Sequence, residues 1–252
     1  MDFEVLGVVD LRSGFAVRAR GGRREKYLPI ERVAGETIQP GDAKALARHY
    51  VERFGLRALY VADLDAIDRR LPTNADLHAL ASVGAPVWLD AGITSVSDAR
   101  RALSCGASRL IVGLETLPSF EVLESICQSA GGRVVFSLDL RDGMPVTPAR
   151  GVRQASPEEL AVRAAAAGAG AVIVLDLARV GSGSGIDLEM LARIRSSVLT
   201  VPVYAGGGVR NVEDIRQVQR AGCAGVLVAS ALLDGLITKH DLDLCLVPAP
   251  ST

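Results

Sequence analysis

The sequence predicts an α/β protein folded as a closed (β/α)8 barrel, built from two similar half-barrels. Its 252 residues fit one such domain, which needs about 250. Short apolar runs alternate with amphipathic helical stretches, an order typical of parallel strands joined by crossover helices. The second half of the chain also repeats features of the first half in the same order. We therefore expect a single domain over residues 1–252, with half-barrels at about 1–120 and 121–245.

The apolar runs supply the eight expected barrel strands. The chain is 49% hydrophobic but only 4% aromatic, as expected for strands of Val, Leu, Ile and Ala that are buried on both faces. An open, doubly wound sheet is the competing architecture, but it gives no reason for a four-plus-four repeat. The strands are predicted at Val5–Asp10, Ala58–Asp63, Pro86–Asp90, Arg109–Gly113, Val134–Asp139, Ala171–Asp176, Val201–Ala205 and Gly225–Ala229, and helices at Ala43–Phe54, Val96–Ser104, Pro157–Ala167 and Val212–Ala221.

The internal repeat covers all four βα units of each half. Asp10 and Asp139 close the first and fifth strands, and each is followed by Leu-Arg, one further residue and Gly. Chance similarity between apolar strands could produce one such match, but not four in register. The other matched pairs are Asp63 with Asp176, Gly92 with Gly208, and Gly113 with Ala229.

Aspartates at the strand ends are the first candidates for chemistry, because sites of this fold lie where strands lead into helices. Any one of them is as readily a helix cap or a polar strand exit. Asp10 and Asp139 differ from the others because they are repeat-equivalent and lie on opposite sides of the barrel mouth. We expect them to form an acid–base pair acting on one central ligand. The five strand-end aspartates are Asp10, Asp63, Asp90, Asp139 and Asp176.

A glycine loop after the seventh strand predicts a phosphate site. Backbone N–H groups of Gly206, Gly207 and Gly208 can cradle an oxyanion, and the end of strands seven and eight is the usual phosphate position in this fold. Ala229 and Ser230 would complete the site, although an ordinary turn is the alternative. The expected partner is a phosphorylated small molecule, which we expect Asp90, Gly92, Gly113, Asp176 and Ser182 to contact.

Two further loops are open to two interpretations. Gly181–Gly185 is either a mobile loop that closes over substrate or an idle connector. The Arg20–Arg24 run is either a solvated surface or a group of cations that reaches an anionic ligand.

Other functions find little support in the sequence. A net charge of −1 gives no general attraction to nucleic acid or to an anionic membrane. No metal or cofactor motif occurs, no lysine ends a strand, and the four cysteines are too widely spaced for a zinc site or a disulfide framework. We expect reduced thiols, no cofactor, and a cytoplasmic enzyme, because no signal peptide opens the chain. The oligomeric state is left open.

These motifs together resemble the histidine-biosynthesis barrel family, from about Val5 to Leu236. Its members are the phosphoribosylformimino-aminoimidazole-carboxamide ribotide isomerase and the cyclase subunit of imidazole glycerol phosphate synthase. The resemblance implies an enzyme without metal or cofactor, in which Asp10 and Asp139 serve as the acid–base pair of an Amadori rearrangement. The Arg-x-Gly turn after Asp10 is more similar to the isomerase than to the cyclase.

Several positions depart from the family pattern. Asp90-Ala91-Gly92 stands where the isomerase has three glycines, and Leu114-Glu115 stands where it has a small hydroxyl residue. The two carboxylates should repel a phosphate from the N-terminal half unless a cation such as Arg109 relieves them. Two alternatives therefore remain beside a sugar-phosphate isomerase. One is a divergent paralogue acting on another phosphorylated metabolite, as in the biosynthesis of one-carbon carrier cofactors, and the other is a non-catalytic barrel.

Overall fold

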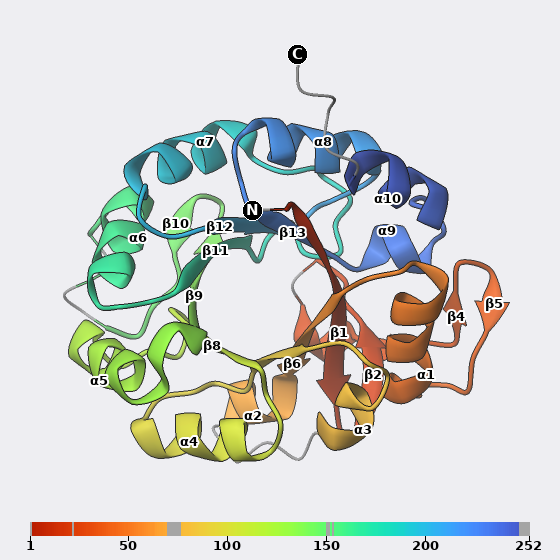
Figure 1. The fold of residues 1–252 in the computed structure, drawn as a ribbon, viewed down its shortest axis with the longest axis horizontal. Coiled ribbons are helices and arrows are strands. Elements are labelled where there is room, and N and C mark those ends of the chain that lie inside the picture. Colours follow the sequence, from red (N-terminus) through yellow and green to blue (C-terminus); the bar gives the residue numbers. More distant parts are fainter. Residues whose placement is uncertain (1, 22, 70–76, 150–151, 153, 247–252) are drawn as a thin grey trace.

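The computed structural model describes residues 2–21, 23–69, 77–149, 152 and 154–246 of the chain. Figure 1 shows a central barrel of strands enclosed by a ring of helices. Parallel pairing joins each barrel strand to the next, and β13 pairs with β1, with Glu4 opposite Gly225. The barrel is therefore closed. Its strands are β1 (Glu4–Arg12), β6 (Ala58–Asp63), β7 (Val87–Asp90), β8 (Arg109–Gly113), β9 (Val134–Arg141), β11 (Ala171–Asp176), β12 (Val203–Gly206) and β13 (Gly225–Val228).

All eight predicted strands are confirmed, but β1 and β9 extend further than expected. Each continues into a hairpin, with β2 (Phe15–Arg18) and β10 (Met144–Pro145) pairing antiparallel to them. Both turn residues have positive φ in each hairpin, 51° and 80° at Ser13-Gly14 and 51° and 76° at Asp142-Gly143. Turns of this kind match the right-handed twist of the flanking strands. The two hairpins occupy equivalent places in the repeat.

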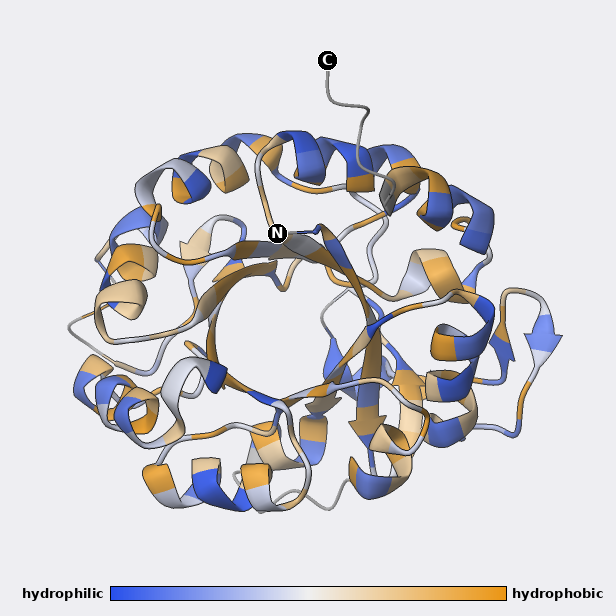
Figure 2. Ribbon diagram, in the orientation of Figure 1, coloured by the Kyte–Doolittle hydropathy of each residue, from blue (hydrophilic) through white to orange (hydrophobic). Residues whose placement is uncertain are grey.

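The apolar core lies in two layers, one inside the barrel and one between the barrel and its helices. Figure 2 shows apolar strands surrounded by helices whose polar residues face outward. Inside the barrel, the rings of Trp88 and Tyr204 meet edge to face at 5.1 Å between centroids. The Arg109 guanidinium lies 4.6 Å from the Trp88 ring centroid. Arg109 begins β8, so it lies at the opposite end of that strand from the loop that follows Gly113.

Three predicted helices form with their expected bounds to within one residue, and their starts are capped by side chains. Ser95 and Asn211 are repeat-equivalent caps, and each accepts a hydrogen bond from the first turn of its helix, as a good N-cap does. The stretch predicted at Ala43–Phe54 is instead an α-helix followed by one π-helical segment. These elements are α4 (Val96–Ser104), α6 (Pro157–Ala166), α8 (Val212–Arg220), α1 (Ala43–Arg48) and η2 (His49–Arg53).

The sequence indicates helices around His78 and His240 without bounds, and these are α3 (Leu77–Ala81) and α10 (Lys239–Leu246); it does not predict the other remaining elements. Those others are α2 (Leu64–Arg69), α5 (Phe120–Ala130), α7 (Leu188–Ser197), α9 (Ser230–Leu233), η1 (Arg24–Lys26), η3 (Gly131–Arg133), β3 (Leu28–Pro29), β4 (Arg32–Val33) and β5 (Glu36–Thr37). Within the described ranges, no helix has both the length and the apolar character that a bilayer crossing requires. All four cysteines are free thiols, and Cys127, Cys223 and Cys245 are buried. Matching hairpin turns and helix caps support the internal duplication, whereas the superposition of the two halves stays a prediction.

Candidate active site

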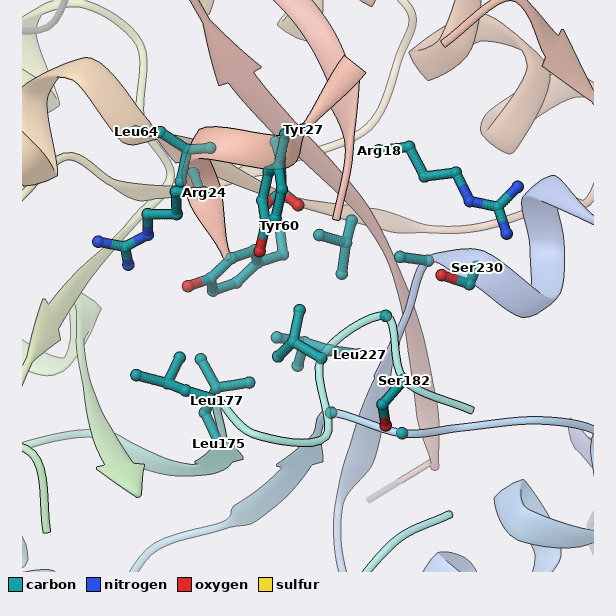
Figure 3. Close-up of a pocket in the computed structure, with 18 of the residues that line it drawn as sticks. Arg18, Arg24, Tyr27, Tyr60, Leu64, Leu175, Leu177, Ser182, Leu227 and Ser230 are labelled. Atoms are coloured by element: carbon teal, nitrogen blue, oxygen red, sulfur yellow. The ribbon is translucent and has the colours of Figure 1, made fainter. Parts of the chain in front are cut away.

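A cavity of about 740 Å³ opens among the carboxyl ends of the barrel strands and the loops that follow them. Figure 3 shows Arg24, Tyr27 and Tyr60 on one side of it, and Arg18 and Ser230 on the other. Seven predicted site residues line the cavity: Asp10, Asp90, Ser182, Gly207, Gly208, Ala229 and Ser230. Five do not line it and lie in its walls or behind them: Gly92, Gly113, Asp139, Asp176 and Gly206.

Asp10 lies on the cavity face of β1, where every second residue, from Val8 through Asp10 to Arg12, faces the ligand space. Loss of hydration inside the barrel raises the pKa of Asp10 to about 7, with repulsion from Asp90 adding to the shift and attraction to Arg24 opposing it. A carboxyl that titrates near neutral pH can both accept and donate a proton. Its position and its pKa agree with the predicted role in acid–base chemistry.

Asp139 lies deeper, at 2% exposure. The hydroxyl of Ser137 donates a 2.6 Å hydrogen bond to its Oδ1, and the backbone N–H of Glu115 donates a 3.0 Å bond to its Oδ2. Burial, and then repulsion from Glu115, hold the pKa of Asp139 well above its usual value despite these two donors. Asp139 therefore keeps its proton to a higher pH than an ordinary carboxyl, which suits a general acid. The cavity wall at Glu115 separates it from the ligand space.

Asp90 is held by a partner that the sequence did not indicate. The Tyr60 hydroxyl donates a 2.9 Å hydrogen bond to Asp90 Oδ2, and the Gly92 N–H donates a 3.3 Å bond to Oδ1. The pKa of Asp90 rises to about 6, mainly through burial and then through repulsion from Glu115, while the Tyr60 hydroxyl and other donors oppose the rise. In the sequence Tyr60 is one residue of an apolar strand, and only its position on the cavity face of β6 indicates a role in the site.

Arg24, and not Arg109, is the cation beside these carboxyls. Its guanidinium forms ion pairs with Glu115 and, at 2.7 Å, with Asp68. The expectation that Arg109 relieves the repulsion is therefore wrong, because Arg109 lies on the Trp88 ring at the other end of β8. The solvated interpretation of the Arg20–Arg24 run is also wrong for Arg24, whose side chain is 23% exposed and lines the cavity. Gly22, in the same run, lies outside the described residues.

The loops after β12 and β13 present unoccupied hydrogen-bond donors. Within the described part of the chain, the backbone N–H groups of Gly207, Gly208, Val209, Ser230 and Ala231 make no hydrogen bond to another protein atom. Gly207 and Gly208 have φ of 88° and 90°, and a Cβ at Gly207 would lie 2.6 Å from the Asp176 carbonyl oxygen. Only glycine fits this backbone path. Gly206, by contrast, is the last residue of β12 and packs against Leu175 and Leu227.

The sixth loop is hydrogen-bonded to its neighbours, and its closure over substrate stays a prediction. Gly185 N–H donates a 3.1 Å hydrogen bond to the Gly208 carbonyl, and Arg179 donates one of 3.0 Å to the Gly185 carbonyl. Asp176 binds Arg179 at 3.0 Å, so its carboxylate positions this loop and does not line the cavity. At the other end of the loop, Gly181 lies directly against the Ala19 carbonyl of the first loop.

The fold and the cavity thus define a barrel with carboxyls that titrate near neutral pH at one end of its site and free backbone donors at the other. A family model described as histidine biosynthesis protein matches residues 4–238, and the chain belongs to this family. A curated relative from Natronomonas pharaonis is 34% identical over 245 residues, covering 95% of this chain and 96% of the relative. Another from Halorhodospira halophila is 32% identical and covers 92% of each chain. Both carry the name 1-(5-phosphoribosyl)-5-((5-phosphoribosylamino)methylideneamino)imidazole-4-carboxamide isomerase.

Proposed function

We propose that this protein is an Amadori-type isomerase that converts a phosphorylated ribosylamine, an aldose derivative, into the corresponding aminoketose. The main support is Asp10, whose pKa of about 7 suits proton transfer at neutral pH. The opposite wall of the same cavity offers unoccupied backbone donors for a phosphate. The named relatives are isomerases of a phosphoribosyl compound, which supports the same class of reaction here.

The proposed chemistry needs one acid and one base. Protonated Asp139 gives its proton to the ring oxygen of the sugar, the bond from C1 to that oxygen breaks, and the amine lone pair forms a C1=N iminium. Ionised Asp10 then removes the C2 proton, and the electron pair of that bond forms C1=C2 as the iminium becomes a neutral enamine. C1 takes a proton from solvent and the C2 hydroxyl loses one, which leaves a ketone at C2. No atom is gained or lost, so neither oxidant nor reductant is required.

The location of Asp139 sets a condition on this mechanism. Its Oδ2 accepts the N–H of Glu115, and that loop forms part of the wall between Asp139 and the ligand. We propose that ligand binding turns the Glu115 side chain aside while its backbone N–H stays on Asp139, so that the two carboxyls on β1 and β9 face the same sugar. In a barrel these strands are four positions apart and face each other across the mouth.

The phosphate is proposed to bind at the loops after β12 and β13. Backbone N–H groups aimed at one point are a recurring anion site in proteins. The free donors of Gly207, Gly208 and Ser230 surround this end of the cavity, and the Ser230 hydroxyl adds a side-chain donor.

The test is direct assay of the purified protein with phosphorylated ribosylamines, with ketose formation followed by NMR. We expect turnover with at least one N-(5-phosphoribosyl)amine, and its loss in Asp10→Asn. If neither an imidazole-carboxamide ribosylamine nor a simple aryl ribosylamine is converted, the isomerase proposal fails and the non-catalytic alternative gains support.

A further inference from the structure

The two half-barrels contribute ends of opposite chemistry to the cavity. The end formed by β12 and β13 has free donors, as described above, whereas the end formed by β7 and β8 is their repeat equivalent, 116 positions earlier in the sequence. Equivalent backbone groups at the two ends differ in whether another protein atom already accepts their hydrogen bond.

In the N-terminal half, three of the five equivalent donors are already used, while the N–H groups of Ala91 and Ile93 make no hydrogen bond among the described residues. The N–H of Gly92, which corresponds to free Gly208, donates to Asp90 Oδ1 at 3.3 Å. The N–H of Leu114, which corresponds to Ser230, donates to the Ser137 carbonyl at 2.9 Å. These acceptors belong to the protein itself, so the donors are not available to a phosphate.

The third equivalent pair shows the same contrast. Glu115 N–H donates to Asp139 at 3.0 Å, whereas Ala231 N–H is free among the described residues. The next residue in each half makes the same turn, since Thr116 and Leu232 both donate to the carbonyl three positions earlier, at 3.1 Å and 3.0 Å. This turn is therefore alike in the two halves, and the difference lies in the acceptors that meet the donors after β7 and β8, which are Asp90 on β7 and Ser137 and Asp139 on β9.

Side chains strengthen the contrast. Asp90 and Glu115 line the cavity at the N-terminal end, where the C-terminal half has Gly206 and Ala231. Arg24 is a cation at this end, but its two terminal nitrogens bind Glu115 and Asp68. A phosphate that bound the remaining N–H groups of Arg24 would lie beside both carboxylates, which would repel it. Arg141 also lines the cavity, but it is exposed on the rim at the end of β9, where solvent screens its charge.

We propose that the cavity binds a substrate with a single phosphate, which lies at the loops after β12 and β13. Asp90 and Glu115 then face another group of the same molecule, one that is uncharged or cationic and donates hydrogen bonds. This inference rests on the proposed function for its substrate class and narrows that class. It separates this chain from the named relatives, whose substrate carries two phosphoribosyl groups by its printed name. The two carboxylates then serve as acceptors for amine, amide or hydroxyl hydrogens.

The first test counts and places anions. Wild-type protein is titrated with inorganic phosphate by calorimetry, and crystals are soaked in the same salt. We expect one phosphate per chain, located at Gly207, Gly208 and Ser230, and no phosphate at Gly92 and Leu114. Ser230→Asp, checked for folding by circular dichroism, should weaken the single site by about tenfold or more. Two phosphates per chain, or one at Gly92 and Leu114, would overturn the proposal.

The second test compares a monophosphate with its bisphosphate, for which ribulose 5-phosphate and ribulose 1,5-bisphosphate are matched probes. In wild type, the second phosphate should give no gain in affinity. Glu115→Gln removes a carboxylate and frees the terminal nitrogen of Arg24 that binds it, so it should shift the preference toward the bisphosphate by about tenfold. A bisphosphate that binds the wild type more tightly than the monophosphate contradicts the proposal. Both tests measure binding without turnover. A failed isomerase assay would therefore not change the number of phosphates bound, and a result of two phosphates would not contradict the isomerase proposal.

Discussion

Ser137 and Asp139 lie two positions apart on β9, and the Ser137 hydroxyl donates a 2.6 Å hydrogen bond to Asp139 Oδ1 inside the barrel. Residues two apart on a strand share one face, so this contact follows from the strand itself. It is also a donor that stabilises the ionised form of Asp139, and it opposes the burial that raises the pKa of that group.

Replacing Ser137 by Ala should therefore raise the pKa of Asp139 further. If Asp139 acts as the protonated acid, the alkaline limb of the kcat profile will move to higher pH, because the group keeps its proton longer. The loss of a hydrogen bond to the protonated carboxyl should also cost about 0.5–1.5 kcal/mol of stability. Ser108→Ala is the matched control, since that hydroxyl donates to the Val87 carbonyl at 2.7 Å at the other end of the barrel. An unchanged alkaline limb in Ser137→Ala would argue against Asp139 as the acid.

Asp10→Asn and Asp139→Asn should each lower kcat by about 10²–10⁴, the usual contribution of a general acid or base. Substrate affinity should change much less, because the phosphate donors lie on other strands. Steady-state kinetics on the converted ribosylamine measure both constants. Asp243→Asn, which removes a surface pair with Lys239, controls for a general effect of losing a carboxylate. If either active-site variant kept the wild-type kcat, that aspartate would not act as an acid or a base in the reaction.

Asp10→Asn should also stabilise the fold at alkaline pH. The folded-state pKa of Asp10 is raised from 3.8 to about 7, so the folded protein binds this proton more tightly than the unfolded chain does. The contribution of Asp10 to stability consequently falls as pH rises between these two values. The variant should show a higher Tm than wild type at pH 8, with a smaller difference at pH 5. An equal Tm difference at both pH values would show that Asp10 is not destabilised by burial.

Gly181→Ala should separate the first and sixth loops. Gly181 has φ of 65°, and an added Cβ would collide with the Ala19 carbonyl. Gly183 has φ of 69° and open space around its Cβ position, so Gly183→Ala carries a comparable backbone strain without the collision. We expect Gly181→Ala to lower kcat/KM by about ten- to a hundredfold, as small displacements of a positioning loop do, and Gly183→Ala to have a much smaller effect. Equal losses of kcat/KM in both variants would show that backbone strain, and not the contact between the two loops, causes the effect.

The sequence predicted the barrel because strand and helix periodicity is local, and because the repeat doubled the signal. It placed Asp10 and the Gly207-Gly208 loop at the cavity because both lie at strand ends, whose place in a barrel follows from the fold. It could not predict the Arg24–Glu115 ion pair, which joins residues 91 positions apart through the conformation of a long loop. The hydrogen bond from Tyr60 to Asp90 depends on register between β6 and β7, where Ala62 lies opposite Asp90. The depth of Asp139 depends on the neighbouring loop that holds Glu115 over it.

The most direct test of acid–base isomerisation is the reaction in D2O, with the product analysed by NMR. Removal of the C2 proton by Asp10, followed by protonation of C1 from solvent, predicts an aminoketose with one deuterium at C1. Asp10→Asn should form no such product at a comparable rate. A ketose that retains the original C2 hydrogen at C1 without solvent deuterium, or the absence of any ketose from every phosphorylated ribosylamine supplied, would contradict the account.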